Sequence, residues 1–540
     1  MFRSRNTKMK VFGPVLLVVS LLLIGLCTQA EVENILITND VSPFACDPAE
    51  IMFWNHYRSG VLMYDGLTYP AAEGGVQPHL AESWESMAGT GYDWIFHLRQ
   101  GVKFHDGTEV TAEDVVFSFQ RTLDLGLGAY GLVEPIKEIS AIDDYTVRFT
   151  LNRAVSVFPA VITYAFILNK DLVMQHLGPG DHGEMGDYGL EWVRYNDAGS
   201  GPYTLEVHEV NMKLEFERFE DYFLGWPDYG DNLVPIEKVR IIALWEPTTA
   251  KNLVIDRELD VTYSTFPQST FEELDAIEGI DLNAVNKSHV LVFHLNTQKK
   301  PTDDVHFRRA LNYAFDASQT FPVWGSRPGH VIGTIYPEHN PDAALYERNL
   351  DKMKEELALS EYPQDTPLTI WWPIGDYFFD VMVGVLAADL TAAGFNIKVE
   401  QLQGLAPLIS GCSSPDTQGH AVPLQYAPEY PDADSTLNRV WYFAGGYSGS
   451  HWFDDPQLKE QIELGRATVD AEQRKAIYQE IERYLLDQAP LILVSEVDPV
   501  RAMQDYIYVD TENIAGITGA AVNFYYYRID LNRKAELLGQ

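Results

Sequence analysis

The residue patterns that usually carry catalysis or metal binding are weak in this 540-residue sequence. Residues 126–131 spell G-x-G-x-x-G, but they follow a predicted helix instead of joining a strand to one, which predicts a loop and not a dinucleotide site. Residues 446–450 approach a nucleophile elbow, but the glycine after Ser448 comes one position early. The 14 histidines form no close ligand cluster, and no H-E-x-x-H, C-x-x-C or Walker loop is present. We therefore predict a protein that is not an enzyme and needs no metal or cofactor.

Composition and charge indicate a large acidic globular protein. Apolar residues make up 46% of the chain, aromatic residues 12%, and the formal net charge is −39. An acidic surface repels phosphate backbones, so nucleic acid is excluded as a partner. The surface is interpreted as a solvated acidic one, with at most a modest preference for cationic ligands.

The N-terminus has the layout of a signal peptide. An apolar run at residues 11–26 follows a basic stretch, and small residues at Thr28 and Ala30 predict cleavage after Ala30. The run is short for a membrane span of roughly 20 residues. Leu26 stands where a lipobox has a small residue, so cleavage is favoured over lipidation at Cys27. We expect an exported protein, either periplasmic or at the cell surface.

The elements downstream are clearest between Leu80 and Arg121. Apolar and polar residues alternate over 94–98, which predicts a strand with one buried face. Asp106-Gly107 is a turn pair, since glycine adopts the positive φ that a tight turn requires. Thr111 begins a sequence like a capping box, followed by an apolar run. The stretch therefore predicts a strand, a turn and a capped helix in close succession.

As a string, these residues resemble the signature of solute-binding family 5, the oligopeptide- and dipeptide-binding proteins of ABC importers. The family motif reads LA-x-SW, an aromatic strand, LR-x-G-V-K-FHDG and T-A-E-D-V-V-F-S, and residues 80–84, 98–107 and 111–118 match it. The segments D-A-G-S-G-P-Y at 197–203 and P-T-D-D at 301–304 continue the resemblance. It implies an α/β, two-lobed periplasmic-binding-protein fold of type II, the Venus-flytrap arrangement, with an extra subdomain in the first lobe.

Mapped onto this chain, the resemblance divides it into a signal peptide and three structural units. Lobe I is expected from residues 31–75, 200–290 and 501–540, the inserted subdomain from 76–199, and lobe II from 291–500. The chain would then pass between the lobes twice, and two extended crossings make a hinge.

The resemblance also locates a ligand site in Q-Y-A-P-E-Y-P-D-A-D, residues 425–434. In the family an aspartate here pairs with the α-ammonium of a bound peptide, and alignment puts Tyr426 at the aromatic position before it, Glu429 at its own position and Asp432 in the turn. A partly buried carboxylate binds an ammonium strongly when the pair is hydrogen-bonded. Glutamate is one methylene longer, so the ammonium would be shifted or the ligand would differ. Aromatic residues in segments that border the family's cleft add five candidates: Phe44, Trp54, Trp372, Tyr377 and Trp452.

The function implied is an exported receptor that captures peptides in the interlobe cleft and delivers them to a membrane permease with ATPase subunits, acting as a monomer. An oligosaccharide ligand stays open, because stacked aromatics serve sugars and the chain has 11 tryptophans. A secreted hydrolase is the alternative from another class, although no catalytic motif supports it. Import and a sensing role are not separated by the sequence.

Cys46 and Cys412 are the cysteines of the mature chain. Export would permit a disulfide between them. In the implied fold such a bond could bridge the lobes and hinder opening, so we expect free thiols.

Overall fold

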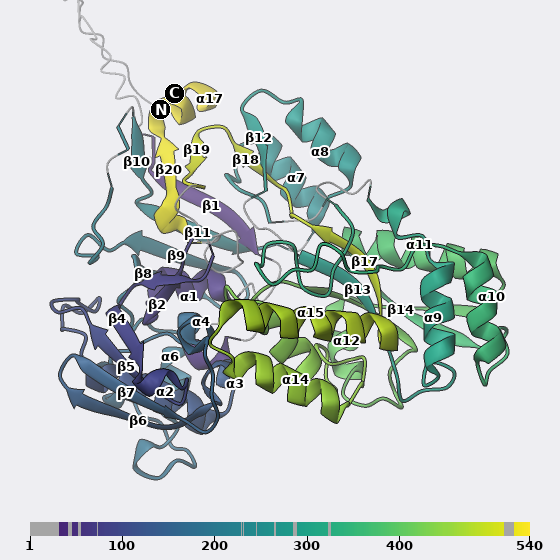
Figure 1. Ribbon diagram of the computed structural model, residues 1–540. Coiled ribbons are helices and arrows are strands. Elements are labelled where there is room, and N and C mark those ends of the chain that lie inside the picture. Colours follow the sequence, from purple (N-terminus) through teal and green to yellow (C-terminus); the bar gives the residue numbers. More distant parts are fainter. Residues whose placement is uncertain are drawn as a thin grey trace, which may run out of the picture.

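The computed structural model describes residues 32–40, 46–51, 56–72, 74–227, 229–230, 232–244, 246–263, 266–284, 289–321, 326–511 and 523–539. Phe44, Trp54 and the predicted signal peptide lie outside these described residues. Three main sheets organise the described chain, each built from a different part of the sequence (Figure 1). No helix within the described ranges is long and apolar enough to cross a lipid bilayer.

The N-terminal sheet brings together strands that lie far apart in the sequence. Its spatial order is β1 (Ile35–Asp40), β11 (Lys238–Ala243), β9 (Lys213–Arg218) and β8 (Tyr203–Glu209). β1 and β11 run parallel, and the other pairs are antiparallel. The nearby helices are α1 (Tyr57–Met63), α7 (Pro247–Ile255), α8 (Gln268–Asp275) and α17 (Leu531–Leu538).

The end of the chain returns to this region and completes it. The short strands involved are β10 (Leu233–Pro235), β12 (Ile280–Asn283), β18 (Arg501–Gln504), β19 (Ile507–Val509) and β20 (Tyr527–Asp530). β18 pairs with β12, and β20 pairs with both β10 and β19. Lys534 Nζ donates to the carbonyl oxygens of Glu33 and Ile35 at 3.2 and 2.8 Å, so the two ends of the described residues lie together (Figure 1).

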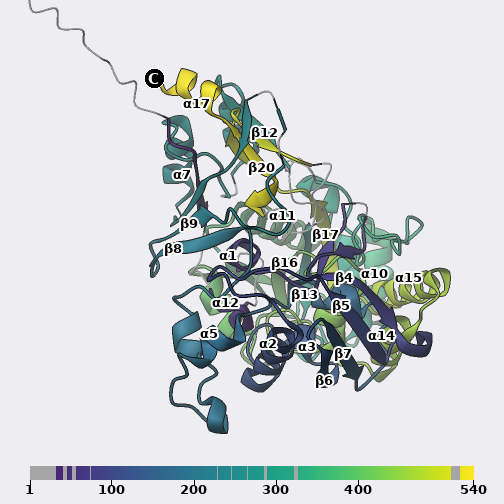
Figure 2. The same ribbon diagram turned by 90° about the vertical axis from the view of Figure 1, so that its left-hand side faces the viewer.

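A second sheet is formed by strands that fall in sequence between β1 and β8 of the N-terminal sheet, so we call it the inserted sheet, and we call residues 76–199 the inserted part. It lies beside the N-terminal sheet (Figures 1 and 2). Its antiparallel strands, in spatial order, are β4 (Ala81–Ser86), β5 (Asp93–Leu98), β7 (Thr146–Leu151) and β6 (Ile136–Asp143). The predicted alternation in β5 is confirmed, because Trp94, Phe96 and Leu98 are all buried. Helix α2 (Ala112–Leu125) begins after the capping residue Thr111, as predicted, and ends at Gly126 with φ of 61°.

The same part of the chain holds several short elements. They are β2 (Thr68–Pro70), β3 (Val76–Pro78), α3 (Tyr130–Val133), α4 (Phe158–Val161), α5 (Lys170–Met174), α6 (Leu190–Val193) and the 3-10 helices η2 (Met87–Gly89), η3 (Ile162–Tyr164) and η4 (Gly183–Met185). One hydrophobic cluster runs from the N-terminal sheet into the inserted sheet and includes Leu36, Phe216, Phe96 and Phe149. The two sheets therefore share a core.

The FHDG motif joins the inserted part to the 197–203 segment through His105. Its Nδ1 lies 2.8 Å from Asp197 Oδ1 and its Nε2 lies 2.8 Å from the carbonyl oxygen of Gly201. A carboxylate and a carbonyl oxygen only accept, so both ring nitrogens donate and the ring is an imidazolium. Burial lowers the pKa of His105, but Asp197 and the Gly201 carbonyl outweigh burial and the pKa is raised.

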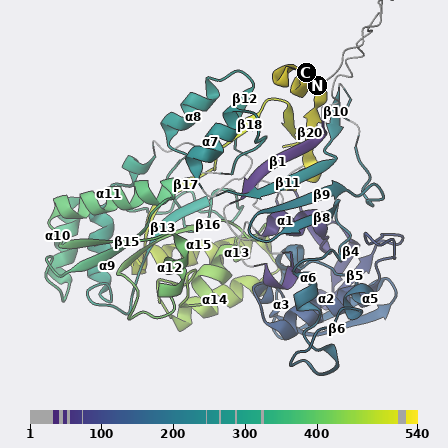
Figure 3. The ribbon, with the colours of Figure 1, turned by 180° about the vertical axis from the view of Figure 1, so that it is seen from behind.

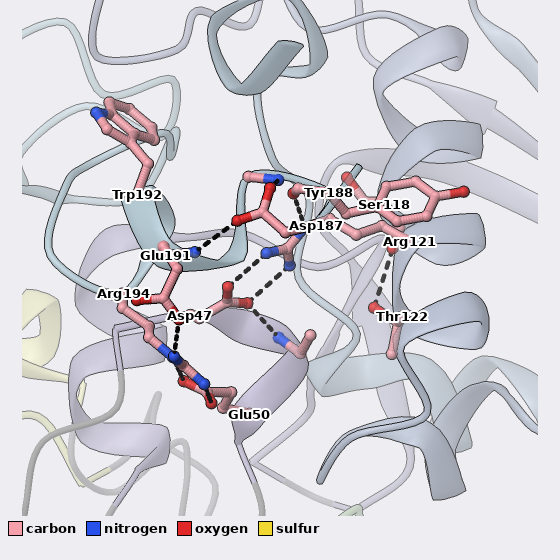
Figure 4. A network of polar contacts seen from close by, with 12 residues as sticks. Asp47, Glu50, Ser118, Arg121, Thr122, Asp187, Tyr188, Glu191, Trp192 and Arg194 are labelled. Atoms are coloured by element: carbon pink, nitrogen blue, oxygen red, sulfur yellow. Dashed lines mark hydrogen bonds and ion pairs between the residues drawn. The ribbon is translucent and has the colours of Figure 1, made fainter. Parts of the chain in front are cut away.

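Two ion pairs, one buried and one partly exposed, fasten the inserted part to the 3-10 helix η1 (Pro48–Glu50) (Figure 4). The guanidinium of Arg121 on α2 donates to both carboxylate oxygens of Asp47, at 2.7 and 2.5 Å, and neither side chain is exposed. Arg194, just after α6, contacts Glu50 in the same two-pronged way at 3.0 and 2.6 Å. Bidentate pairing fixes orientation as well as distance, so η1 is held firmly against this part of the chain.

The central sheet has the order β15-β14-β16-β13-β17. Its strands are β13 (His289–Leu295), β14 (Leu368–Pro373), β15 (Ile397–Leu402), β16 (Ala421–Tyr426) and β17 (Leu491–Val497). An α/β unit lies at one edge of this sheet: helix α11 (Tyr377–Ala393) ends at Gly394, where φ is 100°, and β15 follows. Glycine supports that left-handed conformation without strain.

Helices cover both faces of the central sheet (Figure 3). They are α9 (Val305–Ala314), η5 (Ala317–Thr320), α10 (Leu350–Leu359), α12 (Leu405–Gly411), α13 (Asp434–Thr436), the π-helix η6 (Leu437–Tyr442), α14 (Pro456–Ala467) and α15 (Ala471–Gln488). Leu291 and Phe293 of β13 pack with α9 and α11, whereas Val290 and Val292 pack with η6, α14 and α15. Alternate residues of one strand therefore serve two cores.

Cys46 and Cys412 are both buried and unbonded, which confirms the expectation of free thiols. Burial raises the pKa of both thiols, that of Cys412 to about 12. Both therefore stay protonated and unreactive near neutral pH.

Candidate functional site

A cavity of about 280 Å³ lies between the inserted part of the chain and the loops that follow β16. Its walls come from three separate stretches, namely Ile51 with Tyr57, residues 128–132, and residues 429–449. A second cavity of about 80 Å³ is lined by residues 424–448 and shares the Tyr57 wall. These stretches belong to two bodies of the protein. The first body holds the N-terminal and inserted sheets, and the second holds the central sheet. A molecule bound in the cavity would therefore contact both bodies.

The segment that spells G-x-G-x-x-G is one wall of the larger cavity. It leaves α2 at Gly126, as predicted for a loop after a helix, and enters α3 at Tyr130. Gly128, Ala129 and Gly131 line the cavity. Small residues there bring the backbone close to the enclosed space.

Glu429 lies in the loop after β16 and lines both cavities, so the structure brings this predicted residue to the cavity wall. Its N–H donates to Ser435 Oγ at 2.8 Å, which holds the loop. Its carboxylate Oε1 lies 2.8 Å from Nη1 of Arg439 on the π-helix η6. Burial raises the pKa of Glu429, and Arg439 opposes that rise. The Glu429 carboxylate, which was predicted to pair with the ammonium of a ligand, is thus already paired with Arg439.

Arg439 was missed by sequence reasoning. It is the only lysine or arginine between Lys398 and Lys459, so a buried acid in this stretch had one nearby cation to pair with. The scarcity of basic residues in this stretch was the sequence signal that could have identified Arg439. π-helices are uncommon and are enriched at functional sites, but their position is not readable from residue propensities.

Tyr426 ends β16 and lines the smaller cavity, so it too lies at the predicted place. Within the described residues, its hydroxyl has no hydrogen-bond partner. Burial raises the pKa of this phenol well above its ordinary value. The hydroxyl is therefore a neutral group that can donate or accept.

Asp432 does not line either cavity. Its carboxylate contacts Arg474 on α15 at 3.1 Å, and Arg474 also contacts Glu338 at 2.8 Å. Burial raises the pKa of Asp432 to about 7, against the attraction of Arg474. The turn that carries Asp432 is therefore held to α15 from inside the protein.

Trp372, Tyr377 and Trp452, the described aromatic candidates outside residues 425–434, do not line either cavity. Trp372 donates from Nε1 to Asp380 Oδ1 at 2.7 Å, and Trp452 donates to Gln418 Oε1 at 2.7 Å. Tyr377 begins α11 and packs against the core of the central sheet. None of the three is a lining residue. The aromatic rings that line the cavities, and that sequence reasoning did not select, are Tyr57, Tyr430, Phe443 and Tyr447.

His451 is completely buried. Its Nε2 donates to the carbonyl oxygen of Val440 at 2.7 Å, and its Nδ1 accepts from the N–H of Phe453 at 2.8 Å. Burial lowers its pKa to about 4. The neutral ring stacks on Trp441 with 4.6 Å between centroids and supports η6 from behind.

A second contact region joins the inserted part to α14 (Figures 1 and 3). Ser156 donates its N–H to the carbonyl oxygen of Arg466 at 2.7 Å, and its hydroxyl approaches the carbonyl oxygens of Arg466 and Thr468 at 2.9 and 3.0 Å. Arg153 lies 3.5 Å from Glu463. We call Arg153, Ser156, Glu463, Arg466 and Thr468 the edge contact. Its carbonyls are among those that the end of a helix leaves without intrahelical partners.

The site has the chemistry of binding. Among the described residues, no group of three or more His, Cys, Asp or Glu side chains could hold a metal ion. The cavity offers a carboxylate, a guanidinium, tyrosine rings and glycine backbone. These groups pair charges, donate hydrogen bonds and stack.

Known proteins share this sequence and fold. The profile of bacterial extracellular solute-binding proteins, family 5 (middle region), matches residues 75–448. The dipeptide-binding protein of Escherichia coli is 24% identical over 534 residues, covering 91% of this chain and 95% of that protein. DppA from Helicobacter pylori, solved in complex with the peptide STSA, has a TM-score of 0.76 at 21% identity over 92% of this chain and 98% of its own. AgaA from A. tumefaciens, solved with agropinic acid, has a TM-score of 0.76 at 20% identity over the same shares.

These neighbours are periplasmic binding proteins of the two-lobed type II fold, and the expected fold class is confirmed. In this chain the larger cavity lies between residues 128–132, which follow α2, and the loop and π-helix that follow β16 of the central sheet. Because the family profile spans most of the sequence, the protein belongs to the bacterial extracellular solute-binding proteins, family 5.

Proposed function

We propose that this protein captures peptides in the cavity between its lobes and delivers them to an ABC importer composed of a membrane permease and ATPase subunits. It acts as a binding protein without catalysing a reaction. The observation that carries the proposal is the cavity itself, because residues of both bodies line it and Glu429 and Arg439 both face it.

The relatives support a peptide ligand by their names. The similar proteins include a dipeptide-binding protein and a binding protein solved with a peptide. A peptide has charged ends and a polar backbone, which suit a carboxylate, a guanidinium and exposed glycine backbone. Within the family's general role in solute binding, the proposal specifies peptides as the solute of this protein.

The oligosaccharide alternative has less support. No tryptophan is among the described residues that line the two cavities. Tyrosine and phenylalanine rings do line them, so sugars belong in the test. The Glu429–Arg439 pair at the cavity wall suits a charged ligand better than a neutral sugar, because each charged group of the ligand can contact the opposite charge of the pair.

Native mass spectrometry of protein purified without refolding tests the proposal first. Co-purified peptide would appear as adducts with residue-sized mass steps, and sugar as hexose or pentose steps. Calorimetry with stripped protein would follow, using di-, tri- and tetrapeptides and maltotriose. Binding of maltotriose with no peptide binding would replace the peptide proposal by the sugar one.

The same proposal covers export and assembly. We propose that the signal peptide is removed after Ala30, that Cys27 goes with it, and that the mature protein is a monomer. The intact mass of protein recovered from an expressing cell's envelope would equal residues 31–540. A lipid-sized mass increase with Cys27 at the N-terminus would contradict this.

A further inference from the structure

We propose that Arg439 determines specificity by acting as a fixed counter-ion to Glu429, so that the cavity selects ligands that bring an acidic group of their own together with a cationic group. The inference rests on the proposed function only in placing the ligand in this cavity. The ligand class is a compact zwitterion, one whose carboxylate reaches Arg439 while its ammonium approaches Glu429.

The pair sits where a ligand would meet it. Glu429 and Arg439 both line the larger and the smaller cavity, with 2.8 Å between Oε1 and Nη1. The Arg439 side chain is 32% exposed and that of Glu429 is 16% exposed. By contrast, the arginine pairs Arg121–Asp47 and Arg466–Asp434 are fully buried. Those pairs are structural, whereas Glu429–Arg439 faces an enclosed space.

Arg439 is held in position by its helix. Its neighbours Leu437, Val440 and Trp441 on η6 are 0%, 3% and 0% exposed and pack into the core beneath the cavity. The backbone of η6 is therefore fixed by its buried side, and Arg439 projects from the other side. The packing of those neighbours therefore sets the point from which the Arg439 side chain reaches the cavity, and its pairing with Glu429 sets the direction of the guanidinium.

Charge then decides which ligands fit. A lone buried carboxylate would attract any ammonium, but this carboxylate is already neutralised by a guanidinium. An added ammonium would place two cations beside one anion in a partly desolvated space, which is unfavourable. A ligand carboxylate restores the balance as a second anion, and the planar guanidinium with its five N–H donors can serve two acceptors.

The cavity volumes favour a compact ligand. The two adjoining spaces measure about 280 and 80 Å³, and the charged pair borders both. A ligand whose positive and negative groups lie within one such space can satisfy Glu429 and Arg439 together. A long peptide would bring only its N-terminus to the pair and its carboxylate would lie elsewhere.

Calorimetry with matched probes tests this. The probes are a dipeptide with free termini, its N-acetyl form, its C-terminal amide, and the non-peptide pair 6-aminohexanoate and hexylamine. Wild type should bind the free dipeptide more than tenfold tighter than its amide. In Arg439→Gln that ratio should fall below threefold. The matched control is Arg348→Gln, because Arg348 is equally exposed at 32% and pairs with Asp389 at 3.2 Å, away from both cavities.

A double variant shows whether an effect of Arg439→Gln on binding comes from the lost charge or from misfolding. Glu429→Gln combined with Arg439→Gln removes both charges and so leaves no unpaired ion in the wall. It should unfold within a few degrees of wild type and bind the acid and the amide equally. If the acid-to-amide ratio in Arg439→Gln equals that of wild type, or if wild type binds both forms alike, the inference is overturned while peptide binding stands.

The same panel separates this inference from the proposed function. If 6-aminohexanoate binds more than tenfold tighter than hexylamine, the preference requires Arg439 and no peptide binds, the peptide proposal fails and this inference holds. Binding of hexylamine alone would overturn both. Absence of binding by every probe would likewise overturn both.

Discussion

The negative charge of Glu429 is already balanced within the protein by the guanidinium of Arg439. Its pKa is raised by burial, so the ionised form depends on Arg439 for compensation. The loop holds it by a hydrogen bond from its own N–H to Ser435. The two residues therefore act as one unit, and removing either changes what the other presents to the cavity.

Substituting Glu429 should weaken binding strongly. We expect Glu429→Ala to lower affinity for a free dipeptide more than tenfold, because it removes the anion near the ligand's ammonium and leaves Arg439 uncompensated. Calorimetry measures the change. Asp432→Asn is the control, since Asp432 contacts Arg474 outside the cavity, and its affinity should stay within threefold. Equal affinities for wild type and Glu429→Ala would contradict the prediction.

A second residue-scale prediction concerns His105, whose imidazolium bridges Asp197 and Gly201. Its pKa is raised in the folded protein. The stabilisation is therefore fully present below the ordinary histidine pKa of about 6.5 and disappears as pH rises through the folded value. Hydrogen bonds to charged groups are worth about 1.5–3 kcal/mol.

Denaturant unfolding of wild type and His105→Gln between pH 5 and 9 checks this. The loss of free energy of unfolding should be largest at the acid end of that range and shrink toward alkaline pH. The control is His97→Gln on β5, at an exposed position. A His105→Gln loss that stays constant with pH would show that the ring acts only through packing.

At the scale of elements, the 197–203 segment shows why its glycines are required. A Cβ at Gly199 would lie 1.8 Å from the carbonyl oxygen of Met63, and one at Gly201 would lie 2.5 Å from that of Leu62. The segment presses its backbone against the end of α1, whose first residue, Tyr57, lines the cavity. The glycines therefore help to place a cavity wall.

We expect Gly199→Ala to lower the free energy of unfolding by about 2–3 kcal/mol, because backbone atoms on both sides would have to move. Thermal and denaturant unfolding would measure it. Gly384→Ala in α11 is the matched control, since a Cβ there has no atom within 4 Å and alanine is a better helix former. A Gly199→Ala protein as stable as the control would contradict the expectation.

Element prediction from sequence succeeded where the signal was local. The capped start of α2 and the alternation of β5 depend on residues a few positions apart. The Glu429–Arg439 pair depends on how a loop and a π-helix fold back on each other. Trp372 and Trp452 were predicted near ligand from their segments, but the direction of a side chain is set by tertiary packing. Residue type and spacing do not encode that direction.

At the scale of the whole molecule, the edge contact is the place where the inserted part meets α14. Ser156 bonds the end of α14, and the Arg466 side chain on that helix reaches Asp434 at 3.1 Å. Asp434 also accepts from the hydroxyl of Tyr430, which lines the cavity. Contacts made only when the lobes are together bias the balance toward closure.

Removing the Ser156 hydroxyl should therefore shift that balance. We expect Ser156→Ala to weaken ligand binding about threefold to tenfold, in line with a net value of about 0.5–1.5 kcal/mol for a hydrogen bond. Small-angle scattering of the ligand-free protein should show a larger radius of gyration. Ser318→Ala, at an exposed 3-10 helix start, should change neither quantity. An unchanged affinity in Ser156→Ala would assign the edge contact to packing alone.

The return of the chain's end to its beginning also bears on secretion. β18 and β20 complete the region of β1, and Lys534 bonds the carbonyls of Glu33 and Ile35. The body that contains β1 therefore lacks β18 and β20 until the chain has been synthesised to residue 530. Long-range closure of this kind slows folding. A chain that is still unfolded can be threaded through a narrow channel, so this strand order would favour export before folding.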